Sequence, residues 1–248
     1  MLSLRSIIAV LLLVVIGVVV YRLPARWISD RIDAPGVEID GVAGSVWRGQ
    51  ITRLAVNGEP VAPLAWRLDP LALFSGRIEA AVEVYPRGGA ITGTLVATRN
   101  QALEARDLKI NGALQHIAGS TSLGPILGDI DAQFDKLAVA PAGLTAAIGF
   151  VAIDNLRYPV NAPYALGGFQ LDCNDESGPP VECALRDQGD GPLEVNANLA
   201  LGPARAYQLD GQVRARPNAP PELRQGLVFL GPADANGFHE LQFEGSLD

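Results

Sequence analysis

Residues 193–201 read LEVNANLAL, and apolar side chains occupy every second position from Leu193 to Leu201. A period of two indicates a β-strand with one buried and one solvated face. Strands of this kind belong to antiparallel sheets, because parallel sheets are buried on both faces. This stretch therefore predicts an antiparallel β-protein.

The same alternation recurs every ten to twenty residues, with turn residues such as those of 86–89 and 190–192 in between. It favours a mainly β fold, in which antiparallel sheets fold over into a curved, elongated sandwich or groove, because sheets with one apolar face must hide it. The segments are RIEAAVEVY (77–85), TLVAT (94–98), DIDAQFDKLAV (129–139), FQLDC (169–173), YQLDGQV (207–213) and FHELQFEGSL (238–247).

Three sets of side chains should point to a common interior, and the alternate positions should meet water. The predicted interior sets are Ile78/Ala80/Val82/Val84, Ile130/Ala132/Phe134 and Leu193/Val195/Ala197/Leu199/Leu201. The predicted solvated positions are Asp129/Asp131/Asp135 and Glu194/Asn196/Asn198.

A few short helices are expected between the strands. Asp69 is a good N-cap before Pro70 at a first helical position, so a turn or two should follow up to Gly76. Residues 114–118 predict another turn, and residues 222–230 predict the clearest helix of the body.

Composition limits the classes of function. The chain has 248 residues, 48% of them hydrophobic, which is enough for one large domain or two small ones. A net charge of −8 argues against a nucleic-acid binder. No G-x-S-x-G elbow, Walker A loop or dinucleotide fingerprint occurs, and His116 and His239 stand alone. We expect no enzyme activity, no metal and no cofactor.

Residues 7–21 form an uncharged apolar run, IIAVLLLVVIGVVVY, in a leader with a net charge of +3, whereas the remainder carries −11. The favoured interpretation is a membrane anchor over residues 6–23, which would leave residues 1–5 and a β-rich domain over 24–248 on opposite sides of the membrane. A cleaved signal peptide and a buried core helix remain alternatives. Arginines on both sides of the run leave the orientation undecided.

Cys173 and Cys183 enclose nine residues around Gly178-Pro179-Pro180. In a hairpin, the strands on either side of that turn can bring the two Cα atoms within disulfide range, and free buried cysteines are the alternative. A disulfide requires an oxidising compartment, which would place the body outside the cytoplasm.

Two segments then carry a specific pattern, GVAGSVWRG (41–49) and LAWRLDPLALFSG (64–76). Together with Gly191-Pro192-Leu193 and the late segment LVFLGP (227–232), they resemble the type II secretion system protein N family over nearly the whole chain. Tight turns and ring packing suggest a structural role for the motif residues. Those residues are Gly41, Gly44, Trp47, Gly49, Trp66, Pro70 and Gly76.

The resemblance implies a single-pass protein of the inner membrane of a Gram-negative bacterium, with residues 1–5 in the cytoplasm and the β-rich domain, 24–248, in the periplasm. It also implies no enzymatic activity and no cofactor. Its expected function is accessory: it assists the export of folded proteins across the outer membrane by binding other components of the machinery. Inner-membrane lipid is a further expected partner, nucleic acid is not, and homo-oligomerisation is left open. The body is also distantly similar to AsmA-type envelope proteins, so lipid handling in an apolar β-groove is the alternative.

Overall fold

The structure is a computed structural model, and it describes residues 23–26, 37–56, 59–60, 63–86, 88–98, 102–117, 126–160, 162–204 and 206–246. Within these ranges no helix is both long and apolar enough to cross a membrane. The predicted anchor, residues 6–23, lies outside the described residues except for Leu23, and it stays a prediction.

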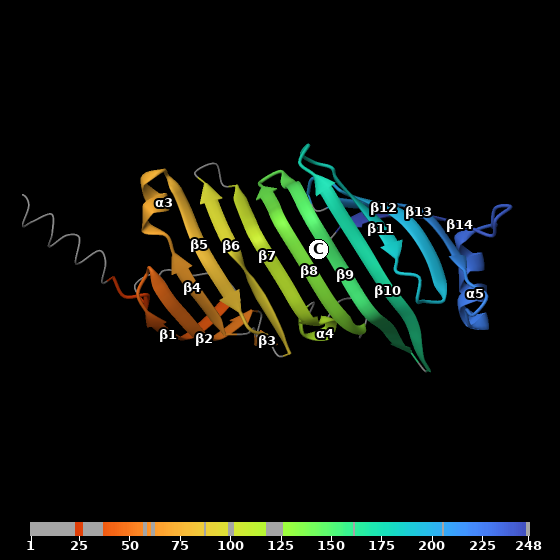
Figure 1. Ribbon diagram of the computed structural model, residues 1–248, viewed down its shortest axis with the longest axis horizontal. Helices are drawn as coiled ribbons and strands as arrows, with labels where there is room; N and C mark the ends of the chain where they lie inside the picture. Colours follow the sequence, from red (N-terminus) through yellow and green to blue (C-terminus); the bar gives the residue numbers. More distant parts are fainter. Residues whose placement is uncertain are drawn as a thin grey trace, which may run out of the picture.

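The described strands form one antiparallel sheet of 14 strands, which lie side by side along the length of the molecule (Figure 1). Each strand pairs with its neighbours in sequence, except that β3 pairs only with β2. The strands are β1 (Val37–Gly44), β2 (Arg48–Val56), β3 (Glu59–Pro60), β4 (Leu64–Leu68), β5 (Arg77–Val84), β6 (Gly89–Thr98), β7 (Leu103–Ala113), β8 (Leu127–Ala140), β9 (Gly143–Val160), β10 (Ala162–Asp175), β11 (Val181–Asp187), β12 (Leu193–Leu201), β13 (Ala206–Ala215) and β14 (His239–Ser246).

The mainly β, antiparallel prediction is confirmed, but the described strands do not divide into the two packed sheets of a sandwich. Successive strand pairing continues from β1 to β14 without a break. Side-chain alternation specifies which residues share a face of a sheet. It does not indicate where the ladder of hydrogen bonds breaks to start a second sheet. The result is one long sheet whose outermost described strands are β1 and β14.

The predicted interior sets share one face of this sheet. Residues directly opposite each other in a ladder point the same way. One row across the sheet links Val84 to Ile91, Ile91 to Ile110, Ile110 to Ala132 and Ala132 to Val151. The row continues through Leu171, Leu185 and Ala197 to Gly211 and Leu241. We call this side of the sheet the apolar face.

The opposite side is the polar face. Asp129, Asp131 and Asp135 are exposed there, as are Asn196 and Asn198, so the predicted faces are confirmed. There are two exceptions. Ile78 lies on the apolar face at the start of β5 and remains 52% exposed, and Glu194, on the polar face, is half-buried and paired with Arg214.

The core consists of two clusters on the apolar face. One surrounds Phe134 and the two cysteines and includes Val181, which is fully buried. In the other, Leu227 of helix α5 (Pro221–Leu227) packs on Val195 and Val213. The helix α5 and the 3-10 turn η1 (Val228–Leu230) therefore cover the apolar face near its C-terminal end.

Two further helices lie where the sequence predicts them, α3 (Pro70–Phe74) and α4 (Leu114–Ile117). The N-cap of α3 is Asp69, whose Oδ1 accepts the Leu71 N–H at 2.9 Å. Figure 1 shows α3 and α5 near opposite ends of the sheet.

Candidate interaction surface

The predicted motif residues meet where β2 and β4 pair. Gly49 lies directly opposite Trp66, and a Cβ on Gly49 would come within 2.3 Å of the Trp66 ring. The Trp66 indole Nε1–H donates to the Val46 carbonyl at 2.9 Å. The absence of a side chain at position 49 thus lets a half-buried ring lie flat on the neighbouring strand.

The other motif residues shape the turns around this ring. Gly44 has a φ of 94°, in the left-handed region, just before the β1–β2 turn. The carbonyl of Trp47 accepts the Leu68 N–H at 2.8 Å, which ties the turn to β4. Gly41 has a φ of 67° and faces Thr52, and Gly76, with a φ of 73°, ends the turn after α3 that Pro70 begins.

A shallow pocket of about 410 Å³ lies behind this ring, on the polar face of β2, β4 and β5. Its walls include Arg48 and Arg67, which are directly opposite each other in the ladder. Like charges in this position are destabilising unless an anion compensates for them. Among the described residues, neither guanidinium takes part in an ion pair, although Glu83 also lines the pocket. The pair could therefore receive a carboxylate or a phosphate.

Exposed apolar side chains lie on α3 and on the nearby part of the apolar face. On α3 itself, Leu71 and Phe74 are 72% and 91% exposed. On the apolar face, a row that begins two residues after Gly76 runs from Ile78 through Ala97 and Leu103 to Val139. We call these residues the α3 patch: Leu71, Leu73, Phe74, Ile78, Leu103 and Val139. Exposed apolar surface of this kind marks interaction sites.

The two cysteines form a disulfide that joins β10 to β11 on the apolar face. They are directly opposite in the ladder, and their Cα atoms are 4.3 Å apart. Beyond the bridge, Asp175 closes the connecting turn, because its Oδ1 accepts from Ser177 and its Oδ2 from the Glu182 N–H. These hydrogen bonds lower the pKa of Asp175, and its acidic side chain needs no metal.

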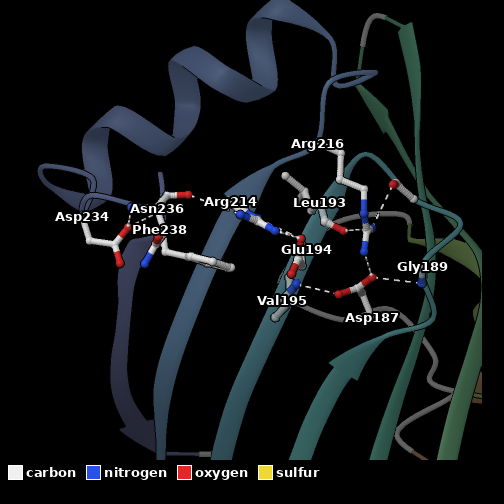
Figure 2. Close-up of polar contacts among 11 residues, drawn as sticks. Asp187, Gly189, Leu193, Glu194, Val195, Arg214, Arg216, Asp234, Asn236 and Phe238 are labelled. Atoms are coloured by element: carbon white, nitrogen blue, oxygen red, sulfur yellow. Dashed lines mark hydrogen bonds and ion pairs between the residues drawn. The ribbon is translucent and has the colours of Figure 1, made fainter.

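A polar network holds the end of β11 against β12 and β13 (Figure 2). The Asp187 side chain is 8% exposed and forms an ion pair with Arg216 at 2.6 Å. Its oxygens also accept the N–H groups of Val195, at 2.7 Å, and Gly189, at 2.9 Å. Burial would raise the pKa of Asp187, but the Val195 N–H and Arg216 outweigh it, and the net effect is a lowered pKa.

A second group in Figure 2 fixes the segment that leads into β14. The Asp234 carboxylate accepts the N–H groups of Asn236 and Phe238, both at 2.8 Å, and the first cause of its lowered pKa is the Phe238 N–H. Arg214 donates to Glu194 at 2.8 Å and lies over the Phe238 ring at 4.4 Å. The turn at Asp234, two residues after the late segment LVFLGP (227–232), therefore sets the start of the last described strand.

Nothing in the described ranges groups three His, Cys, Asp or Glu side chains so that they could hold a metal ion. Of the two histidines, His239 has its Nδ1 2.8 Å from the Gly231 carbonyl, in the turn before β14.

Sequence reasoning missed the arginine pair and the α3 patch. A signal for the pair exists, because Arg48 and Arg67 each follow a tryptophan, as W-R at 47–48 and at 66–67. The spacing of these dipeptides places them opposite each other only once the β2–β4 register is known.

The chain is similar to known proteins of one family. A family model described as type II secretion system (T2SS), protein N matches residues 35–242. The type II secretion system protein N of Aeromonas hydrophila is 25% identical over 249 residues, which cover 96% of this chain and 97% of that protein. The protein of the same name from Vibrio cholerae serotype O1 is 24% identical over 238 residues, 92% of this chain and 93% of that protein. No solved structure matches.

Proposed function

The chain belongs to the type II secretion system protein N family, and on this premise we propose that it is an accessory inner-membrane component of the secretion machinery. It assists the export of folded proteins across the outer membrane by binding other components, and it catalyses no reaction. The single observation that carries the proposal is the family match over residues 35–242.

The surface chemistry supports a binding role. The α3 patch offers exposed apolar side chains on a rigid sheet, with the arginine pair on the polar face of the adjoining strands. Apolar anchors beside polar contacts are the usual composition of protein interfaces. Family membership implies that the partners are other type II secretion components.

The placement in the envelope is part of the proposal. The apolar run of residues 7–21 suits a membrane anchor, and the Cys173–Cys183 disulfide suits a body in an oxidising compartment. We therefore propose a single-pass protein whose body lies in the periplasm.

Deletion and complementation test the function. Deleting the gene in its host should leave an exported enzyme in the periplasm, and the wild-type gene should restore the enzyme activity in the medium. Phe74→Ser in the α3 patch should restore export poorly. Phe229→Ser is the matched control, because the Phe229 ring is 93% exposed on another short turn, against 91% for Phe74. Normal export in the deletion strain would refute the proposal.

A second candidate is lipid handling, and the observation that favours it is the apolar face. One of its rows runs from Leu64 of β4 to Leu241 of β14 without a charged side chain, and among the described residues α5 with η1 covers the face near the C-terminal end. In this case the purified full-length chain should carry phospholipid that mass spectrometry detects, and deletion should change membrane composition. A lipid-free protein with unchanged membranes would leave the first candidate.

A further inference from the structure

The last strand of the sheet, β14, has a neighbour on one side only among the described residues. It pairs with β13 over eight consecutive positions, without a bulge. An edge strand presents backbone N–H and C=O groups that can pair with another chain. The question is which groups on β14 point outward and what partner they suit.

Two hydrogen bonds at the ends of the β12–β13 ladder show which backbone groups of β13 face β12 and which face β14. The Gly202 N–H donates to Ala206, and the Arg216 N–H donates to Pro192. Directly opposed residues alternate between bonded and non-bonded pairs in an antiparallel ladder. The even-numbered residues of β13 therefore bond to β12, and its odd-numbered residues bond to β14.

The same alternation carries over to β14. Its odd-numbered residues Leu241 and Phe243 are opposite Gly211 and Leu209, so they bond to β13. The backbone groups of Glu240, Gln242 and Glu244 consequently point to the open side. Phe238 agrees with this parity, because its N–H and its carbonyl both bond to Asp234, outside the ladder.

The β14 strand has two exposed glutamates as protection against strand pairing and lacks the other usual devices. The strand contains no lysine, no proline and no bulge, which are the other features that block sheet edges. The opposite edge differs, because a preceding segment covers the end of β1. Pro24 forms a bridge with Ser45, and the Ala25 N–H donates to Gly44 at 3.1 Å.

The side chains along the edge define the partner. Leu241 and Phe243 extend the apolar face, and Phe243 is 47% exposed. Glu240 and Glu244 lie on the polar face, where Asp210 of β13 adds a third carboxylate opposite Gln242. A strand that alternates apolar and basic side chains would continue both faces.

A second copy of this chain fits poorly. Two β14 strands paired about a two-fold axis at Gln242 would place Glu240 of one copy opposite Glu244 of the other. The strand β1 carries Asp40 and contains no lysine or arginine, so pairing of β14 with β1 of another copy also lacks a cation. Like charges directly opposite each other are destabilising.

We infer that β14 is a docking edge for an extended segment of another protein, in which apolar residues alternate with lysine or arginine. The partner adds a further strand to the sheet through the outward backbone groups of Glu240, Gln242 and Glu244. The inference deepens the proposed function, on which it rests for the expectation that the partner is a secretion component.

A labelled nine-residue peptide of alternating lysine and valine tests the inference by fluorescence polarisation with the purified full-length chain. Gln242→Pro removes an outward N–H that β13 does not use, and proline is tolerated when the missing N–H faces solvent. We expect this variant to bind the peptide at least about tenfold more weakly, because a donor is lost and the ring meets the incoming strand.

Gln242→Ala is the matched control, because it keeps the N–H and should bind as the wild type does. Reversing the charges with Glu240→Lys and Glu244→Lys should weaken binding of the lysine–valine peptide and strengthen binding of a glutamate–valine peptide. Unchanged urea melts of Gln242→Pro would show that the sheet is intact.

Equal peptide binding by Gln242→Pro and Gln242→Ala would overturn the docking edge, whatever the export assay shows. Normal export in the deletion strain would overturn the proposed function and leave the peptide result standing. The two failures are therefore distinguishable.

Discussion

The Trp66 ring fills the space that a side chain on Gly49 would occupy, and this contact gives a prediction at the scale of single residues. Gly49→Ala should destabilise the protein by about 1–3 kcal/mol, because the added methyl group overpacks the ring. Combining it with Trp66→Leu should cost less than the sum of the two single changes, by about 1 kcal/mol. Urea melts of the four proteins measure this difference.

Trp66→Leu should remove only part of the steric overlap that Gly49→Ala creates. A Cβ on Gly49 would also lie 2.9 Å from the Ala43 carbonyl, a contact that the smaller side chain at position 66 cannot remove. Strictly additive costs would show that Trp66 does not lie on Gly49.

Leu199 gives a second prediction, because it lies on the apolar face between Cys183 and Leu209. Leu199→Asp should cost about 3 kcal/mol in the free energy of unfolding, since it places an unpaired charge among apolar side chains. Urea melts measure it.

The control for this prediction lies on the polar face. Asn198 is exposed but opposite Asp210, so Asn198→Asp would add a small repulsion. Asn196 is exposed, with Arg186 opposite on β11, so Asn196→Asp should be tolerated fully. Equal stability of Leu199→Asp and Asn196→Asp would mean that the strand faces are assigned wrongly.

Asp187 gives a third prediction, on pH dependence. Its pKa is lowered in the folded protein, so its stabilising effect is present above the unfolded pKa of about 3.9 and is lost as the pH falls through the folded value. Asp187→Asn should cost about 2 kcal/mol at pH 7, because Arg216 loses its ionised partner.

Urea melts of Asp187→Asn and the wild type at pH 7, 5 and 3 make the comparison. The difference in stability should be similar at pH 7 and 5 and should narrow at pH 3. A difference that grows on acidification would contradict the lowered pKa.

Among the elements, the β10–β11 hairpin carries the fourth prediction. Purified, unreduced protein should show no free thiol, since Cys173 and Cys183 are bonded. The bridge closes a short loop, and on the chain-entropy estimate it stabilises by about 2–3 kcal/mol. Urea melts of Cys173→Ser combined with Cys183→Ser measure that loss. Two cysteines that react freely with an alkylating agent in native protein would contradict the bond.

Elements with a clean period were predictable, and those without it were not. The segment 193–201 coincides with β12, and the N-cap and proline at 69–70 located α3. The strand β9 was missed, because small and apolar residues follow one another from Thr145 to Ile153 and hide the alternation. Ala146 and Ala147 are adjacent and both buried, so the two faces of β9 are covered at that point.

The candidate surface was predictable only in part, for a similar reason. Glycines beside tryptophan in a short segment indicate a packed turn from local sequence alone. The arginine pair and the α3 patch depend on which strands are neighbours. Ile78, Leu103 and Val139 come together through three ladders that no local pattern specifies.

For the whole molecule, the fifth prediction concerns topology. Alkaline phosphatase fused after Asp248 should be active, and β-galactosidase fused at the same place should be inactive, because the proposed body lies in the periplasm. Reporter activities in intact cells measure this. The reverse result would remove the proposed function, since a body in the cytoplasm could not meet envelope components.

At this scale the prediction was sheets folded over into a sandwich or groove; the described strands form one sheet, and its two faces are those predicted. Period-two patterns determine the side of a sheet on which a residue lies, and the registers agree with them from β5 to β14. These patterns do not specify where strand pairing stops and a second sheet begins. Here each strand except β3 pairs with the next strand of the sheet along the chain.

This serial pairing also bears on how the chain acquires its structure. Apart from the short β3, each strand finds its partners in the segments immediately before and after it. Contacts between near neighbours in sequence cost little loop-closure entropy and form fast. A polypeptide that emerges from a translocation pore amino end first could therefore fold as it arrives, each hairpin templated by the one already in place. The unpaired edge of the sheet would then be the most recently added strand. This limits the time for which unpaired strands are available for aggregation.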